Sequence, residues 1–468
     1  MPPATASRRD PLLWLVAIGF FLQALDSSIL NTALPAMAQS LGRSPLQMQS
    51  VIVAYSLTTA MLIPASGWVA DRFGTRRVYG AAIGLFVLGS VLCALSPNLG
   101  FLVAARVVQG VGGAMMLPVG RLAVLRTYPR GEFIRAMTFI AIPGQIGPLM
   151  GPALGGWLVE VASWHWIFWI NVPVGVIGLW ATWRWMPRAA PLPRRPFDGI
   201  GYALLAFGMV AVSVALDGLS GMGLGMALVV VLMVFGMASL ASYWMHALRA
   251  PQPLFAPALF RIRSLRVGLL GNLFARFGSG ASPFMIPLLL QVGLGFSPLH
   301  AGTMMLATVL GSMVVKRLAV RTVRRFGYRR VLQVNSVLLA LMLASFALTS
   351  AQQPPWLLLG QLFVFGGINS MQFSAMNSVT LKDVEGESAS SGNSLLSMVQ
   401  MLSMSMGVAI AGALMAGYSD VWSSLGDQSL RAIHATFVTV ALMTLAATLV
   451  FSQLERDEPV RETAAHED

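Results

Sequence analysis

The chain has 468 residues, of which 56% are hydrophobic and 10% are charged, and its mean hydropathy is +0.72. This composition excludes an ordinary soluble globular protein and predicts a polytopic membrane protein. The formal net charge of +13 would suggest nucleic-acid binding in a soluble protein. Here the basic residues are scattered over short loops between apolar runs, so we expect no nucleic-acid partner.

Fourteen apolar runs approach the length of about 20 residues that a helix needs to cross the hydrocarbon core. The predicted spans are residues 12–34, 48–69, 78–95, 99–119, 137–159, 166–186, 200–216, 224–247, 267–292, 299–315, 331–348, 356–379, 394–416 and 433–451. Nearly all loop Lys and Arg residues fall on the side of the N-terminus, and only Arg43 and Arg431 fall on the other. The positive-inside rule therefore predicts that both termini lie in the cytoplasm, and we expect a multi-pass protein of a bacterial cytoplasmic (inner) membrane.

The chain repeats itself at one constant offset. Residues 42–46 (GRSPL) match residues 295–299 (GFSPL), and residues 72–77 (RFGTRR) match residues 325–330 (RFGYRR). Two matches at one offset predict two six-helix halves in the same orientation. We expect these parts: an N-terminal six-helix bundle (1–186), two inserted helices with their connectors (187–264), a C-terminal six-helix bundle (265–454) and a cytoplasmic tail (455–468).

The first span contains an ionisable residue, Asp26. A carboxylate at membrane depth is costly and is found mainly where it faces a polar cavity or performs a function. Counting about 1.5 Å of rise per residue places Arg106 of the fourth span at a similar depth, so we expect the two to pair. Protonation of Asp26 would then release Arg106. A pair with a purely structural role is the alternative.

The loop after the second span, residues 67–77, reads GWVADRFGTRR. Gly67 would permit close helix approach and Gly74 a tight turn, while Asp71 among arginines can form a charge network that locks one conformation. The alternative is a solvated loop. The candidate switch residues here are Gly67, Asp71, Arg72, Gly74, Arg76 and Arg77.

The fifth span carries small residues at near-helical spacing, which predicts close helix packing. Its two prolines remove backbone donors and are expected to bend the helix. The residues concerned are Gly144, Gly147, Pro148, Gly151, Pro152 and Gly155.

Residues 25–35, 67–77, 106–110, 144–156 and 164–175 resemble motifs of the fourteen-helix drug:proton antiporters of the major facilitator superfamily. The resemblance covers essentially the whole chain. It implies an all-α major facilitator fold with 14 transmembrane helices (6+2+6) and alternating access, and export of small amphiphilic compounds driven by the proton gradient without a cofactor. It also implies proton coupling at the Asp26–Arg106 pair and a fifth helix that seals the two halves.

The second half departs from the first. At the repeat offset, Asp26 corresponds to Ser279 and Asp71 to Arg324, which leaves the C-terminal bundle without a mid-membrane carboxylate. We therefore expect a single titrating membrane carboxylate and no preference for dicationic drugs. Arg276 has no evident acidic partner, so an anionic or zwitterionic substrate could supply one; alternatively its side chain bonds backbone carbonyls or extends to a polar crevice.

Polar or soft side chains at membrane depth are the candidate cavity residues, although some will be interhelical hydrogen-bonding residues and methionine more often serves ordinary packing. They are Gln23, Asn31, Tyr55, Gln109, Gln145, Asn171, Asn272, Arg276, Gln361, Asn369, Gln372, Asn393 and Met398.

Other chemistry is not indicated. Cys93 is the only cysteine, so neither a disulfide framework nor a Cys-rich metal site is expected, and no nucleophile–base or metal constellation indicates an enzyme. The expected partners are a small-molecule substrate, protons and the lipid bilayer, with the chain as a monomer. Two alternatives remain: an exporter of an anionic metabolite or metal chelate such as a citrate-like compound, because Arg106 and Arg276 outnumber Asp26, and a non-transporting membrane sensor or scaffold.

Overall fold

The computed structural model describes residues 9–128, 130–188, 196–219, 225–384, 388–421 and 428–455, and the regular elements in these ranges are all helices. The helices of the N-terminal bundle are α1 (Arg9–Ser40), η2 (Pro45–Met48), α2 (Gln49–Phe73), α3 (Thr75–Ala94), α4 (Leu99–Thr127), α5 (Arg130–Val161), α6 (Trp166–Trp169) and α7 (Asn171–Trp185). Two inserted helices follow, α8 (Gly199–Gly218) and α9 (Met226–Ala247).

The C-terminal bundle repeats this pattern. Its elements are η3 (Pro257–Arg261), α10 (Arg263–Leu288), the π-helical turn η4 (Leu289–Gly293), α11 (Pro298–Phe326), α12 (Tyr328–Ser345), η5 (Phe346–Leu348), α13 (Pro355–Leu381), α14 (Ser388–Val421) and α15 (Gln428–Phe451).

Each of the fourteen predicted spans has a helix in the structure, which confirms the predicted all-helical membrane architecture. Twelve helical segments of the described chain are long and apolar enough to cross a membrane, and α5 and α13 complete the fourteen. The sixth span is divided at Ile170 into α6 and α7.

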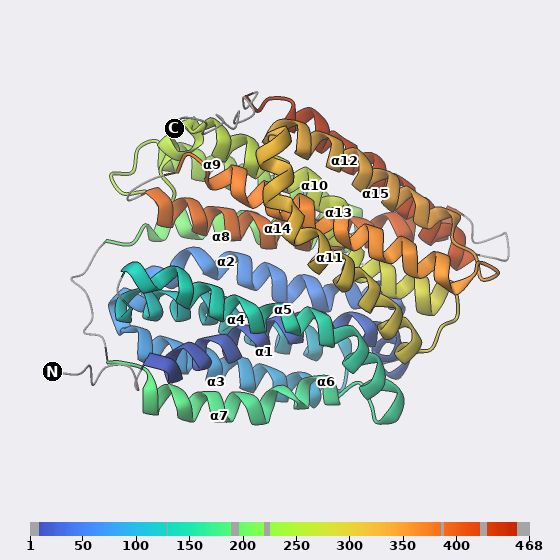
Figure 1. Ribbon diagram of the computed structural model, residues 1–468, viewed down its shortest axis with the longest axis horizontal. Coiled ribbons are helices and arrows are strands. Elements are labelled where there is room, and N and C mark those ends of the chain that lie inside the picture. The colour runs from blue at the N-terminus through green and yellow to red at the C-terminus, as the bar shows by residue number, and fades with distance from the viewer. Residues whose placement is uncertain are drawn as a thin grey trace, which may run out of the picture.

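The two bundles lie side by side, with α5 against α11 and α2 against α14. An even number of crossings brings the start of α1 and the end of α15 to the same end of the molecule (Figure 1). We call this the terminal end, and the opposite one, where α1 ends and η2 begins, the far end.

The internal repeat reappears in the backbone. Among the described residues, the glycines with positive φ are Gly42 (62°), Gly74 (84°), Gly295 (72°) and Gly327 (75°). These are the equivalent positions of the two sequence matches, so both halves make the same two turns with the same left-handed residue, which other residue types adopt at a cost.

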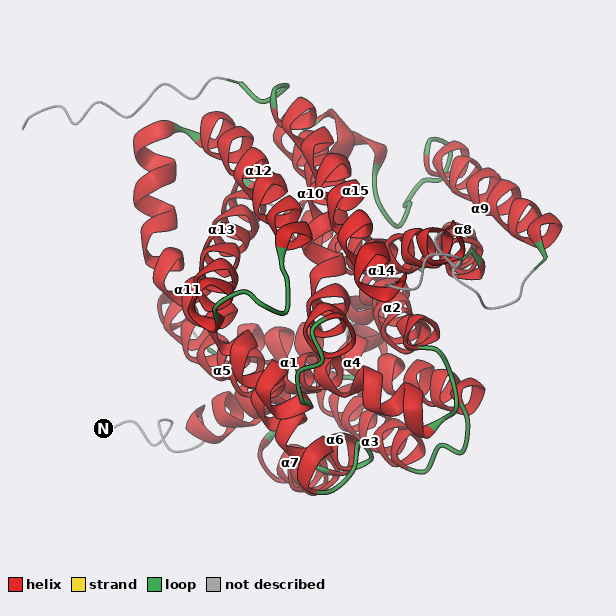
Figure 2. Cartoon of the chain, turned by 90° about the vertical axis from the view of Figure 1, so that its right-hand side faces the viewer, coloured by secondary structure: helices red, strands yellow, loops and turns green. Residues whose placement is uncertain are grey.

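The inserted helices form a hairpin whose inner member, α8, contacts α2 and α14, while α9 lies outside it (Figure 2). Asp198 fastens the hairpin at the terminal end, because its carboxylate accepts hydrogen bonds from Gly201 N (2.8 Å), His246 Nε2 (2.7 Å) and Leu254 N (3.1 Å). Burial acts to raise the pKa of Asp198, but these hydrogen bonds outweigh it and lower the pKa.

The bundles touch closely at the far end. A Cβ at Gly156 of α5 would overlap the carbonyl oxygen of Pro298, and one at Gly302 of α11 would overlap that of Pro152. Gln291 also donates to the carbonyl oxygen of Thr32 across the interface at 2.9 Å. The two halves are therefore closed against each other at this end, with backbone meeting backbone.

The glycine stripe of α5 packs within its own bundle. A Cβ at Gly147 would lie 2.7 Å from the backbone nitrogen of Leu25, and Gly144, Gly151 and Gly155 likewise face α1. The stripe thus lets α1 and α5 approach closely, while Pro152 of the same helix contacts the other bundle.

Gly67 does not have the expected role in this conformation. A Cβ there would meet nothing within 4 Å, so the prediction that Gly67 permits close helix approach is wrong here. The reason is that this position, near the terminal end of α2, is exposed.

Candidate functional site

Asp26 lies at the centre of a buried hydrogen-bond network. Its Oδ2 accepts from Arg106 Nη1 at 2.8 Å, and its Oδ1 accepts from Gln109 Nε2 at 2.8 Å and from Asn171 Nδ2 at 2.9 Å. Ser90 Oγ accepts from Gln109 Nε2 at 2.9 Å. Asp26 and Arg106 are each only 1% exposed. The carboxylate is thus held by three donors from α4 and α7, and the predicted pairing with Arg106 is what the structure shows.

Arg106 has further partners besides Asp26. Its Nη1 donates to Gln109 Oε1 at 2.6 Å and its Nε to the carbonyl oxygen of Val51 at 3.3 Å. Its guanidinium carbon lies 4.4 Å from the ring centroid of Tyr55, a cation–π contact. The cation therefore keeps contacts with α2 and α4 that do not depend on the charge of Asp26.

Small residues bring these helices together. A Cβ at Gly89 of α3 would lie 2.5 Å from the backbone of Gln109, and one at Gly112 of α4 would lie 2.5 Å from the carbonyl oxygen of Ala82. Because α3 and α4 approach this closely, Ser90 reaches the Gln109 amide. Ser90 was not among the predicted site residues; a serine in an apolar span is a weak signal on its own.

The other polar candidates of the N-terminal bundle have separate positions. Gln23 Nε2 donates to the carbonyl oxygen of Gly113 at 3.1 Å and so joins α1 to α4. Asn31 is buried further along α1. The side chain of Gln145 lies outside the described part of the structure.

Arg276 lies on α10 with its guanidinium carbon 4.8 Å from the ring centroid of Phe373. Its Nε donates to Asn272 Oδ1 at 3.3 Å, and Nη2 is buried without a hydrogen-bond partner among the described residues. Asn369, half-buried, lies one turn before Phe373 on α13. Arg276, Asn272 and Phe373 therefore form a cluster in the C-terminal bundle, whereas Asp26 belongs to the N-terminal bundle.

Two candidates serve contacts between helices instead. Gln361 Nε2 donates to Ser345 Oγ at 2.8 Å, which ties α13 to the end of α12. Met398 is buried in an apolar cluster with Leu57 of α2 and Leu205 of α8. Both arrangements match the alternatives of interhelical hydrogen bonding and ordinary packing.

The switch loop contacts its own bundle. Asp71 pairs with Arg126 of α4, and Arg76 donates to the carbonyl oxygen of Trp183 and lies over that ring at 5.2 Å. Arg72 lies 5.2 Å from the ring centroid of Trp68. Gly74 makes the turn, as expected, and Arg77 is exposed. The Asp71–Arg126 pair thus joins α2 to α4, while Arg72 and Arg76 of the predicted network contact aromatic rings instead. Arg76 also ties the start of α3 to α7.

The expectation of a single membrane carboxylate is wrong. Asp217, in the last turn of α8, is 5% exposed and accepts a hydrogen bond from Gln49 Nε2 at 2.8 Å. The predicted seventh span stopped at residue 216, because the carboxylate itself lowers the local hydropathy. A carboxylate directly after an apolar run was the available signal.

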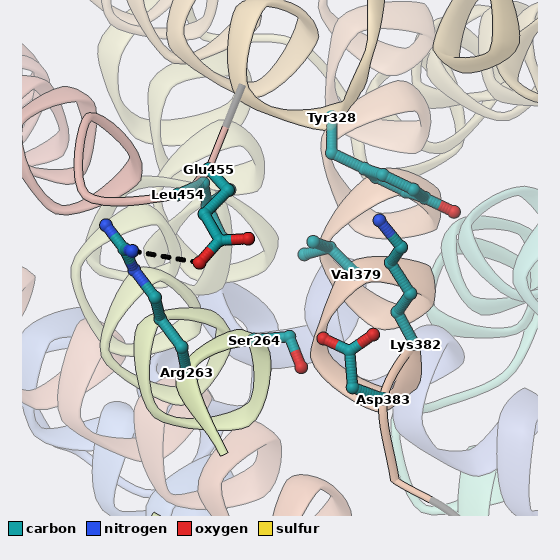
Figure 3. A pocket seen from close by; sticks show the side chains of 8 residues that line it. All are labelled: Arg263, Ser264, Tyr328, Val379, Lys382, Asp383, Leu454 and Glu455. Carbon is teal, nitrogen blue, oxygen red and sulfur yellow. Dashed lines mark hydrogen bonds and ion pairs between the residues drawn. The ribbon is translucent and has the colours of Figure 1, made fainter. Parts of the chain in front are cut away.

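One pocket lies at the terminal end of the C-terminal bundle, and all eight residues that line it belong to that bundle (Figure 3). Its charged lining is balanced, with Arg263 paired to Glu455 at 3.0 Å and Lys382 beside Asp383 in sequence. The Arg263–Glu455 pair is exposed, so it contributes little. Since no residue of the Asp26 network lines it, the pocket is separate from the candidate site.

Comparison with known proteins agrees with this architecture. The family model described as Major Facilitator Superfamily matches residues 16–408 and 268–467. A multidrug resistance protein MdtD of Serratia proteamaculans (strain 568) is 53% identical over 459 residues, covering 97% of this chain and 95% of that protein. A protein of the same name from Escherichia coli (strain 55989 / EAEC) is 50% identical, covering 95% and 94%.

Solved structures share the fold at low identity. The human organic anion transporter MFSD10 (TETRAN) superposes with a TM-score of 0.62 at 16% identity, covering 96% of this chain and all of that one (100%). The peptide transporter POT in complex with sulfate gives a TM-score of 0.70 at 15% identity, covering 94% and 93%. With its fourteen helical spans among the described residues and its buried acid–base pair, this chain therefore belongs to the Major Facilitator Superfamily and is a multi-pass membrane transporter of small molecules, not an enzyme.

Proposed function

We propose that this transporter exports small amphiphilic compounds in exchange for protons and that Asp26 is the coupling carboxylate. The observation that carries the proposal is the enclosure of Asp26 by Arg106, Gln109 and Asn171 at 1% exposure. An ionisable group kept at membrane depth within such a network is expected to have a function. The relatives named for multidrug resistance support the substrate class.

Protonation of Asp26 would act on the network in a defined way. It removes the negative charge that Arg106 Nη1 contacts, and a buried cation without compensation would cost several kcal/mol. Arg106 retains Gln109 Oε1, the Val51 carbonyl and the Tyr55 ring. The arginine can therefore shift toward α2 without becoming isolated, which makes the pair a two-state element that proton and substrate bias in opposite directions.

Proton release tests this assignment. Adding a cationic dye to the purified full chain in weakly buffered detergent is expected to release protons from the wild type and not from Asp26→Asn. Asp420→Asn, at an exposed carboxylate at the end of α14, is the matched control and is expected to behave as the wild type. Equal release from wild type and Asp26→Asn would reject Asp26 as the coupling group.

We further propose that the protein lies in a bacterial cytoplasmic membrane with its terminal end in the cytoplasm. It works there as a monomer, and the proton gradient alone drives it. The distribution of Lys and Arg supports this orientation. In intact cells, a membrane-impermeant maleimide is expected to label Arg43→Cys at the far end and not Arg72→Cys at the terminal end. Cys93 is buried and is expected to stay unlabelled; the reverse pattern of labelling would invert the topology.

A further inference from the structure

Asp217 is a second carboxylate buried in a membrane helix, and no mechanism described above uses it. Its Oδ1 accepts a hydrogen bond from Gln49 Nε2 at 2.8 Å. Among the residues that the structure describes, no Lys, Arg or His forms an ion pair with it. Burying an ionised carboxylate beside a neutral amide alone is unfavourable.

Gln49 connects this carboxylate to the far-end closure. It is the first residue of α2, 1% exposed, and its amide lies directly against Gly412 of α14, where a Cβ would overlap it. Its Oε1 is buried without a hydrogen-bond partner among the described residues. One amide thus touches the N-terminal bundle, the inserted hairpin and the C-terminal bundle.

The unpartnered amide oxygen indicates which form of Asp217 fits this closed interface. A carboxylate only accepts hydrogen bonds, so it cannot satisfy Gln49 Oε1, whereas a protonated carboxyl group can donate to an amide oxygen and still accept from an amide N–H. A buried polar atom without a partner costs about 1–3 kcal/mol. Both the missing donor and the missing cation favour the neutral acid.

We propose that Asp217 is a second proton-binding group of this transporter, protonated while the far end is closed and ionised when opening admits water to α8. The inference rests on proton-coupled exchange as the function. The inference gives the inserted hairpin a role in the transport cycle. The carboxyl group of Asp217 makes the closure between the two bundles sensitive to the proton concentration at the far end.

Other charges near Asp217 do not change this argument. The helices packed against α8 are α2, α9 and α14, and their charged or titratable residues are Tyr55, Asp71, Arg72, Tyr243, His246, Tyr418 and Asp420. Tyr418 and Asp420 lie at the far end, and Tyr55, two turns into α2, has its ring against the Arg106 guanidinium. The Tyr418 hydroxyl bonds Thr439 Oγ1 at 2.6 Å, and Asp420 is exposed, as is Arg43 in the loop before η2.

A distance measurement across the far end tests the proposal. Spin labels are placed at Arg43→Cys and Val421→Cys, both exposed and on opposite bundles, in full-length Cys93→Ser protein in lipid nanodiscs. Raising the pH ionises Asp217 and is expected to shift the wild-type distances toward longer values. Asp217→Asn retains an amide that donates and accepts without a proton, so its short distance is expected to persist at every pH.

Two further variants separate this inference from the function on which it rests. Asp26→Asn is expected to keep the pH-dependent shift in label distance, although it loses substrate-induced proton release. Asp383→Asn, at an exposed carboxylate at the terminal end, is expected to match the wild type in both measurements.

Infrared difference spectra supply a second measurement. The carbonyl band of a protonated carboxyl group should be present in Asp26→Asn and lost from the double variant Asp26→Asn/Asp217→Asn. An Asp217→Asn protein with the wild-type pH response, or a wild type without one, would overturn the proposal.

Discussion

Replacing Arg106 with alanine is expected to abolish transport and to destabilise the protein by about 3–5 kcal/mol, the usual cost of breaking a buried ion pair by removing one partner. The change leaves the Asp26 carboxylate at 1% exposure with only the amide donors of Gln109 and Asn171. It also removes the side chain whose release is proposed to carry the signal. Uptake of dye into inverted vesicles measures the first effect, and the midpoint temperature of unfolding in detergent measures the second.

The double variant Asp26→Asn/Arg106→Ala supplies the control. Because both charges are then absent, its loss of stability is expected to be clearly smaller than the sum of the single losses. Asp26→Asn alone is expected to remain folded, since Arg106 keeps Gln109, Val51 and Tyr55 as partners. An Arg106→Ala protein that transports at more than half the wild-type rate would show that the pair is structural only.

The fold was accessible from the sequence because its determinants are local. Hydropathy locates the spans, and the repeat predicts two equivalent halves. The positive φ values at the matched positions, Gly42 with Gly295 and Gly74 with Gly327, agree with that repeat. The pairing of Asp26 with Arg106 was also accessible, since the rise per residue fixes the depth of each side chain. Depth, however, is only one of two coordinates that place a residue on a membrane helix.

The second coordinate, the rotation of each helix about its axis, explains what the sequence did not predict. In soluble helices an apolar stripe marks the buried face, but in a membrane the lipid-facing side is as apolar as the interior. Gln109 and Gln361 were therefore predicted together as cavity residues, whereas the structure places them in different bundles, with Gln109 bonded to Asp26 and Gln361 to Ser345. Ser90 and the Gln49–Asp217 contact required the tertiary structure.

Replacing Gly156 with alanine is expected to hold the far end open and to reduce transport severely. The new Cβ would overlap the carbonyl oxygen of Pro298, and neither backbone can move without shifting a whole helix. Overpacking of this kind costs about 1–3 kcal/mol, which changes the ratio of closed to open molecules by roughly five- to 150-fold. The label pair at positions 43 and 421 is expected to report longer distances than in the otherwise wild-type protein, at every pH.

Two other glycine variants show whether the effect belongs to this contact. Gly302→Ala places a Cβ against the Pro152 carbonyl from the opposite helix, so it should reproduce both the longer distance and the loss of transport. Gly360→Ala, on α13, adds a Cβ with nothing within 4 Å and should change neither. A Gly156→Ala protein that transported normally and kept short label distances would contradict this prediction, because α5 and α11 would then open and close without this contact. The backbone approach at Gly156 and Gly302 would then be a feature of one resting state and not of the transport cycle.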